Sequence, residues 1–242
     1  MRVLSIVHGE EARTELFRPV VEEAHELDEW SLVWNAPPPR PIDTYDAFLV
    51  FGGAMHADQD DRHPWLRDEN LLLQELLVRG APVLGVCLGA QLLAKAAHAP
   101  VFAAPEPEIG WHEVELTEAA ADDPVLGALP DRFHAFQWHY YTYGIPEGAV
   151  ELARSRACTQ AFRLGETVWG VQFHPEVTRE QVEAWLASDG RNEGISVEEL
   201  AAETRERMGE WNALGRALCG AWLEAAAAIA YEGGATRSAV RR

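Results

Sequence analysis

The chain has 242 residues, with 39 acidic and 20 basic side chains and a formal net charge of −19. A hydrophobic content of 48% with nine tryptophans is typical of a globular protein and excludes an intrinsically disordered one. The acidic balance argues against nucleic acid and anionic membranes as partners, because both select a basic protein face.

The first part of the chain alternates apolar strands with amphipathic helices. Such alternation predicts a parallel sheet covered by helices on both faces, with a site at the carboxyl ends of its strands. The expected elements are a strand over 2–7, a helical pattern over 12–27, a strand over 30–34, and an apolar strand over 47–51 that runs into Gly52-Gly53.

Cys87 lies at a sharp junction between a strand and a helix. A helix is expected over 65–78, followed by a short apolar strand over 82–86 and a second helix over 88–97. Glycines two residues before and after Cys87 let the backbone crowd in at such a turn, and the helix N-terminus favours a thiolate. The turn therefore indicates a nucleophile, although a buried cysteine that acts as a small hydrophobic side chain fits it equally well.

A histidine and a glutamate that could act together with Cys87 follow a strand late in the chain. After a β-rich excursion over about 101–162, the sheet is expected to resume with a strand over 168–173 that ends in His174-Pro175-Glu176. Residues two apart in an extended chain point to the same side, so Glu176 can hold one nitrogen of His174 while the other faces a nucleophile. Cys–His–carboxylate is the arrangement in which a base activates a thiol and a third group orients the base.

With GVCLGAQ at 85–91 and FHPE at 173–176, in this order, the chain resembles the class I, triad-type glutamine amidotransferases over most of residues 1–188. It looks in particular like stand-alone proteins similar to the glutaminase domain of GMP synthase. The resemblance implies an α/β fold with a three-layer, doubly wound, mostly parallel, flavodoxin-like sheet, a small β-rich excursion and C-terminal helices. It also implies Cys87 as nucleophile, His174 as base and Glu176 as the group that orients the base.

The resemblance extends to residues that would meet the substrate. It implies that Gln91 reaches the substrate glutamine and that the backbone amides of Gly53 and Leu88 form the oxyanion hole. His139 matches a histidine of the family beside the glutamine pocket. An aromatic cluster around a satisfied histidine accounts for His139 equally well.

Tyr141 is the position at which the chain departs from the family pattern. An acidic residue is usual there in the resembling proteins, where it would contact the α-ammonium group of the substrate. The resemblance therefore implies weak processing of free glutamine. The alternative is that another acid, for instance Glu108 or Glu113, takes over the role.

One domain with a helical extension is expected. The amidotransferase-like domain is assigned to residues 1–190, a C-terminal helical extension that packs on it to 191–232, and a disordered tail to 233–242. A capping box at Ser196 starts the extension, and its apolar spacing predicts one or two helices. The alternative is an arm that binds a partner.

The cysteine count and the amino terminus predict a cytoplasmic protein. Three widely spaced cysteines form no disulfide framework and no zinc-binding spacing. The first residues lack the apolar core of a signal peptide, and no run approaches the length needed to cross a bilayer. His56, His63 and the acidic run over 58–61 fit no standard metal site and are interpreted as solvated, so no metal is expected.

The leading hypothesis is an enzyme that hydrolyses glutamine or another γ-glutamyl amide through a thioester on Cys87, without a cofactor. A separate synthetase subunit is the expected partner in one version, because the chain has no phosphate-binding loop of its own. The other version is a free-standing γ-glutamyl hydrolase or peptidase. The competing hypotheses are a catalytically silent binding or regulatory protein on the same fold, and another Cys–His hydrolase of similar architecture.

Overall fold

The computed structural model describes residues 1–10, 12–188 and 196–240. In chain order the strands are β1 (Arg2–Ile6), β2 (Glu26–Trp30), β3 (Ala47–Val50), β4 (Val83–Val86), β5 (Val101–Leu116), β6 (Arg132–Tyr143), β7 (Ala149–Arg154), β8 (Thr159–Leu164) and β9 (Val168–Val171). The helices are α1 (Phe17–Glu22), α2 (Trp65–Val78), α3 (Leu88–Ala96), α4 (Arg179–Ser188) and α5 (Val197–Val240).

Within the described residues the strands form one nine-stranded sheet in the order β2-β1-β3-β4-β9-β8-β7-β5-β6. The neighbours from β2 to β9 pair in parallel. The neighbours from β9 to β6 pair antiparallel. The expected β-rich excursion is thus not a separate unit, because it extends the parallel half of the sheet with antiparallel strands.

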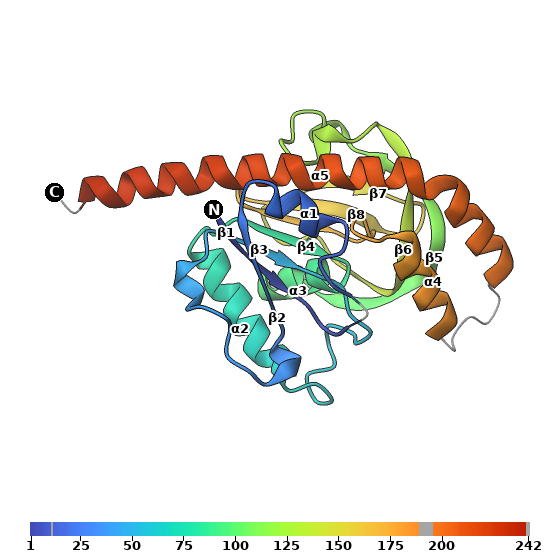
Figure 1. Ribbon diagram of the computed structural model, residues 1–242, viewed down its shortest axis with the longest axis horizontal. Helices are drawn as coiled ribbons and strands as arrows, with labels where there is room; N and C mark the ends of the chain where they lie inside the picture. Colours follow the sequence, from blue (N-terminus) through green and yellow to red (C-terminus); the bar gives the residue numbers. More distant parts are fainter. Residues whose placement is uncertain (11, 189–195, 241–242) are drawn as a thin grey trace.

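Helices cover both faces of the parallel half (Figure 1). On one face α2 and α3 pack against buried side chains of β1, β3 and β4. On the other face α1 and α5 pack against the alternate side chains of the same strands. Apolar side chains on both faces of these strands account for their continuous hydrophobic sequences. The result is the three-layer, doubly wound α/β fold that the sequence predicts.

The second strand lies four residues earlier than the sequence pattern indicates. Residues 32–34 form a 3-10 turn, in which the Val33 amide donates to Ser31 Oγ at 3.2 Å and Asn35 closes the turn with φ 50°. The strand itself is Glu26–Trp30, and it lies at the edge of the described sheet, beside β1. An edge strand exposes polar side chains, so its charged sequence gave no hydrophobic signal.

Two further elements are shorter than expected. The helical pattern over 12–27 forms a helix only at Phe17–Glu22, and the resumed strand ends at Val171 rather than at Phe173. Beyond that strand the backbone bends toward the antiparallel half, because the amide of His174 donates to the carbonyl of Phe136 at 2.9 Å. His174 and Glu176 therefore lie on a loop, not on a strand.

The C-terminal extension is one long helix, α5, which crosses the α1 face of the domain and projects past it (Figure 1). It contributes buried side chains to the core, among them Trp211, Leu218 and Trp222. The helix continues to Val240, and the disorder expected from residue 233 stays a prediction. A helix already formed is extended at little cost by alanine-rich sequence, here Ala225–Ala228. The expected domain boundary at 190/191 and the last two residues lie outside the described residues.

One stretch of α5 corrects the expectation that no run approaches the length of a membrane span. Between Val197 and Tyr231 the helix contains an 18-residue window of mean hydropathy 1.3, which is long and apolar enough to cross a membrane by length and composition alone. One third of that window is buried within the domain. Side chains such as Trp222 account for its apolar character as part of a core helix.

Candidate active site

Cys87 occupies a strained turn between β4 and α3. Its backbone has φ 53° and ψ −107°, a conformation that residues with a side chain rarely adopt. A Cβ at Gly85 would lie 2.6 Å from the Gly89 backbone, and one at Gly89 would lie 2.0 Å from the carbonyl oxygen of Val50. Only glycine fits at these two places, so close packing of the helix on the sheet forces Cys87 to the carboxyl edge.

His174 and Glu176 form a buried hydrogen-bonded pair. His174 Nδ1 lies 2.8 Å from Glu176 Oε1, and both residues are almost fully buried. A Cβ on Gly52 would lie 3.1 Å from His174 Cε1 and 3.7 Å from Cys87 Cβ, so the imidazole and the thiol both flank this glycine. The other ring nitrogen of His174, Nε2, is buried and is left for the thiol of Cys87.

The electrostatics of the site favour an imidazolium. Burial lowers the pKa of His174, but the charge of Glu176, together with the charge and hydrogen bond of Cys87, raises this pKa to about 10. At neutral pH His174 therefore carries a proton. The amide of Gln172, which the sequence reasoning did not single out, donates to Cys87 Sγ at 3.6 Å and can support negative charge there.

The two expected amide donors lie beside the thiol. Gly53 follows β3, Leu88 opens α3, and both line the same cavity as Cys87. A Cβ on Gly53 would lie 3.0 Å from Leu88 Cδ2, so the side chain of Leu88 packs close to the backbone of Gly53. Because β3 and β4 are neighbours in the sheet, their carboxyl ends bring together Gly53 and Leu88, which are 35 residues apart in the sequence.

A cavity of about 270 Å³ opens above Cys87. Its wall is largely aromatic and apolar, and no carboxylate is found among the described residues that line it. The lining residues are Ala12, Gly53, Ala54, Met55, His56, Cys87, Leu88, Gln91, Trp138, His139, Tyr140, Tyr141, His174 and Trp185. Every predicted site residue except Glu176, which holds His174 from behind, therefore contributes to this one cavity.

Tyr141 forms part of the wall through a stack with His56. Their ring centroids are 4.0 Å apart with an interplanar angle of 13°. The interpretation of His56 as a solvated loop residue is thus wrong, and Asp60 of the same loop is half-buried and pairs with Lys95 at 2.7 Å. Gln91 Nε2 donates to the carbonyl oxygen of Tyr141 at 2.9 Å, which ties α3 to β6 within the cavity.

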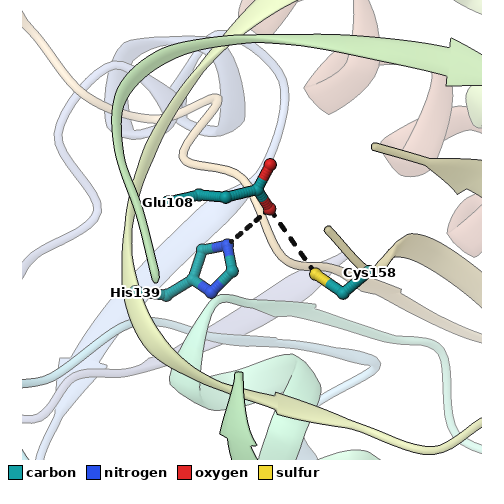
Figure 2. A group of neighbouring side chains, drawn as sticks. All are labelled: Glu108, His139 and Cys158. Carbon is teal, nitrogen blue, oxygen red and sulfur yellow. Dashed lines mark hydrogen bonds and ion pairs between the residues drawn. The ribbon is translucent and has the colours of Figure 1, made fainter. Parts of the chain in front are cut away.

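His139 connects the cavity to a buried polar network (Figure 2). Its Nδ1 lies 3.0 Å from the carbonyl oxygen of Tyr141 and its Nε2 lies 3.2 Å from Glu108 Oε2. Burial raises the pKa of Glu108, but hydrogen bonds with His139 and Ser155 outweigh it and hold this pKa below its usual value. His139 is thus held by a carboxylate from behind the wall.

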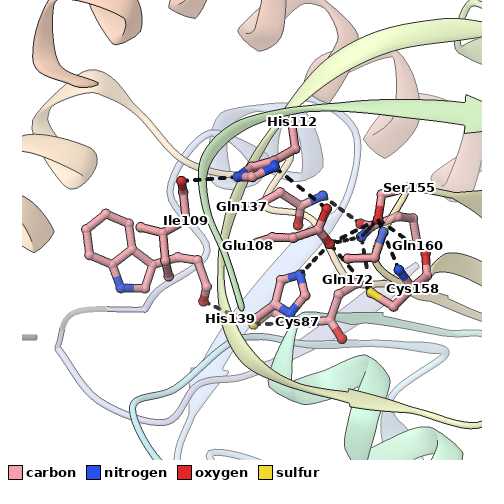
Figure 3. Close-up of polar contacts among 12 residues, drawn as sticks. Cys87, Glu108, Ile109, His112, Gln137, His139, Ser155, Cys158, Gln160 and Gln172 are labelled. Atoms are coloured by element: carbon pink, nitrogen blue, oxygen red, sulfur yellow. Dashed lines mark hydrogen bonds and ion pairs between the residues drawn. The ribbon is translucent and has the colours of Figure 1, made fainter. Parts of the chain in front are cut away.

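The same network is the one place in the described residues where a metal ion has three side chains to bind. The ligand atoms of Glu108, His139 and Cys158 lie within 4.8 Å of one another. Figure 3 shows that Glu108 is already surrounded by donors: Gln160 Nε2 lies 2.7 Å and Ser155 Oγ 3.1 Å from its Oε2. The carboxylate is therefore satisfied without an ion.

Helix α5 holds the loop that carries His174. Trp211 Nε1 donates to the carbonyl oxygen of His174 at 2.9 Å, and Asn212 Nδ2 donates to that of Val177 at 2.8 Å. A Cβ on Gly215 would lie 2.1 Å from the carbonyl oxygen of Pro175, so the helix touches the loop backbone. Sequence reasoning missed this role, because an apolar helical pattern indicates burial but not what the helix covers.

Near neutral pH, iodoacetamide is expected to alkylate Cys87 ahead of the other two cysteines. Burial raises the pKa of both Cys158 and Cys219 to about 12, so both remain thiols, whereas Cys87 lines the cavity beside His174. Peptide mapping by mass spectrometry at increasing reagent concentration gives the order. Reaction of Cys158 or Cys219 first in the folded protein would contradict the assignment.

Comparisons with known proteins find similar sequences and structures over most of the chain. A family model for glutamine amidotransferase class-I matches residues 18–190. The glutamine amidotransferase-like protein YfeJ of Salmonella typhimurium is 30% identical over 224 residues, which are 87% of this chain and 93% of that protein. The structure of a glutamine amidotransferase from Thermotoga maritima matches with a TM-score of 0.84 at 29% identity, covering 93% of this chain and 98% of that chain.

Two relatives have more specific names. A γ-glutamyl-L-1-hydroxyisopropylamide hydrolase of a Pseudomonas species is 29% identical over 180 residues, which are 67% of this chain and 60% of that enzyme. The glutamine-hydrolysing GMP synthase of Aeropyrum pernix is 36% identical over 146 residues, which are 56% of this chain and 28% of that enzyme. The chain thus spans less than two thirds of each.

Proposed function

This chain belongs to the class I glutamine amidotransferase family, and we propose that it is a cysteine hydrolase that cleaves glutamine or another γ-glutamyl amide through a thioester on Cys87. One observation carries the proposal. Cys87 is forced into a strained turn beside His174, whose other nitrogen is held by Glu176 at 2.8 Å. A thiol, a base and a group that orients the base are the parts that such a reaction needs.

In the proposed first step the sulfur of Cys87 attacks the γ-carbonyl carbon. His174 holds the thiol proton and passes it to the departing ammonia or amine, which leaves a thioester. The backbone N–H groups of Gly53 and Leu88 would receive the negative charge that develops on the carbonyl oxygen.

In the second step water attacks the thioester. His174 takes one proton from the water and returns it to the sulfur as the thioester breaks, so a free γ-carboxylic acid leaves and Cys87 is regenerated. Glu176 keeps the imidazole in place throughout and stabilises its positive charge.

Two versions of this function differ in the fate of the nitrogen. A glutaminase subunit would hand ammonia to a synthetase partner, as the match to GMP synthases suggests. A free-standing γ-glutamyl hydrolase would release an amine, and the match to the hydroxyisopropylamide hydrolase favours this version. The wall of aromatic side chains around the cavity also favours an amide with an apolar substituent.

A substrate panel tests the proposal. The protein is incubated with glutamine and with γ-glutamyl amides of small and aromatic amines, and Cys87 is examined by mass spectrometry for a glutamyl adduct. An adduct with any member supports the thioester, and the best substrate separates the two versions. Absence of adduct and of amine release across the panel would favour the catalytically silent alternative.

Free glutamine is expected to be processed with a high KM, and Tyr141→Asp is expected to lower that KM by about ten- to a hundred-fold. A carboxylate facing an α-ammonium group contributes a charge-assisted hydrogen bond of about 1.5–3 kcal/mol, which a phenol cannot supply. Neither alternative acid lines the cavity, because Glu108 is bound behind His139 and Glu113 is exposed.

Steady-state kinetics on glutamine measure this effect. Tyr141→Phe is the matched control, since it keeps the ring that stacks on His56 and adds no charge. A wild-type KM within the ordinary range of about 1 μM to 1 mM, unimproved by Tyr141→Asp, would show that the tyrosine does not weaken glutamine binding.

A further inference from the structure

A further buried His–Glu pair lies behind the loop that joins β3 to the cavity. His8 Nε2 lies 2.9 and 3.0 Å from the two carboxylate oxygens of Glu69, which is completely buried on α2. His8 follows β1, and the ring of Trp65 stacks on it with centroids 5.6 Å apart. His8 is not among the residues that line the cavity. The mechanism above uses neither member of this pair.

The other nitrogen of His8 holds two backbone carbonyl groups. His8 Nδ1 lies 3.0 Å from the carbonyl oxygen of Phe51 and 3.0 Å from that of Gly52. A carbonyl oxygen only accepts, so Nδ1 must carry a proton. Glu69 faces Nε2 in the same way, and although burial lowers the pKa of His8, the charge of Glu69 outweighs it and raises this pKa. His8 is thus held from both sides, with Nδ1 donating to the two carbonyl groups and Nε2 facing the carboxylate of Glu69.

The anchored carbonyl fixes the direction of the next amide. No cis peptide bond is found in the described residues, and in a trans peptide the C=O and N–H bonds point in opposite directions. With the Gly52 oxygen directed at His8, the N–H of Gly53 points away from His8. Gly53 lines the cavity with Cys87 and Leu88, so an N–H that points away from His8 is available to a substrate oxygen in this cavity.

The peptide bond between Gly52 and Gly53 needs a contact that fixes its orientation. Two consecutive glycines have wide conformational freedom, so the peptide between them can rotate at little cost. The contacts around Gly53 are tight, because a Cβ there would lie 2.8 Å from His8 Cβ and 2.7 Å from Met55 Sδ. A larger residue that would stiffen the loop is therefore excluded, and the hydrogen bonds from His8 supply the restraint instead.

We infer that His8, held by Glu69, is a positioning residue that fixes the Gly52–Gly53 peptide so that the Gly53 amide can stabilise the oxyanion. The inference rests on the proposed function, because it assigns a task within that reaction. An interaction made only in the transition state changes kcat and leaves KM nearly unchanged. Alkylation of Cys87 by iodoacetamide forms no oxyanion and should not depend on His8.

The test removes the anchor while preserving the fold. Loss of one charge alone leaves the other buried and unpaired, whereas replacing both by apolar side chains of similar size is often neutral for stability. The double variant His8→Phe/Glu69→Met is therefore expected to melt close to wild type and to lose about ten- to a hundred-fold in kcat, at or below the effect of losing one oxyanion donor. The KM and the rate of Cys87 alkylation should change less than about twofold.

His8→Asn/Glu69→Met is the rescue variant, since the Asn amide nitrogen can take the place of Nδ1 while no buried charge is left unpaired, and it should recover most of the kcat. A double variant that folds and keeps its kcat within twofold of wild type overturns the inference and leaves the proposed function intact. If the wild type forms no adduct with any substrate, the proposed function fails instead. In that case the crystal structure of the double variant tests the inference about His8. If the Gly52 carbonyl group keeps its direction in that structure, the inference is overturned.

Discussion

Replacing His174 by alanine is expected to lower kcat on the best γ-glutamyl amide by about a hundred- to ten-thousand-fold, the usual contribution of a positioned general base. His174 is the group beside Cys87 whose pKa is raised to about 10, so it holds the proton that the leaving amine needs. The same variant should slow the alkylation of Cys87, because the thiol loses the partner that takes its proton.

Glu176→Gln is the matched variant, since it keeps the size of the side chain and an oxygen that can accept from His174 Nδ1. It removes only the charge, and a charge-assisted hydrogen bond is worth about 1.5–3 kcal/mol. A loss in kcat of about ten- to a hundred-fold, with the fold intact by circular dichroism, is therefore expected. Equal activity of wild type and His174→Ala on any processed substrate would refute the triad.

The sequence predicts the parallel core and the thiol turn well, because both are local. Continuous apolar runs can be buried only between two helical layers, and the bounds of α2 follow directly from its apolar spacing. The glycines around Cys87 indicate a close approach of backbone to backbone, which the structure places at Gly85 and Gly89. The edge strand β2 was misplaced because exposure removes the hydrophobic signal.

The rest of the site depends on contacts between distant parts of the chain. His56 stacks on Tyr141 across 85 residues, and neither loop nor strand carries a local pattern that indicates this contact. His8 and Glu69 are separated by 61 residues. Each of them, taken alone, is a single polar residue near an apolar run, and nothing in the local sequence indicates that they meet. Only the packing of β1 against β3, with α2 behind the loop, brings them to the back of the site.

The second large effect is expected from a substitution in helix α5, although this helix lies beyond the residues that the family model matches. Gly215→Ala is expected to destabilise the protein by about 1–3 kcal/mol, as overpacking of a close contact does. The new Cβ would lie 2.1 Å from the carbonyl oxygen of Pro175, and a backbone atom cannot move aside as a flexible side chain does. The helix or the loop between His174 and Glu176 must shift.

A shift of this loop should cost activity as well as stability. A displacement of about 1 Å in a catalytic group can lower the rate about a hundred-fold. The kcat of Gly215→Ala is therefore expected to fall by up to about that factor at temperatures where the variant is fully folded. Thermal melting followed by circular dichroism and kinetics at a low temperature measure the two effects separately.

The helix contains its own control. Gly209 lies on α5 six residues before Gly215, and a Cβ built there meets nothing within 4 Å. Gly209→Ala should therefore stabilise the helix by up to about 1 kcal/mol, the difference in helix propensity, and leave kcat unchanged. If both substitutions had the same effect on kcat, the contact between α5 and Pro175 would not position His174, and the helix would serve the domain only through its buried apolar face.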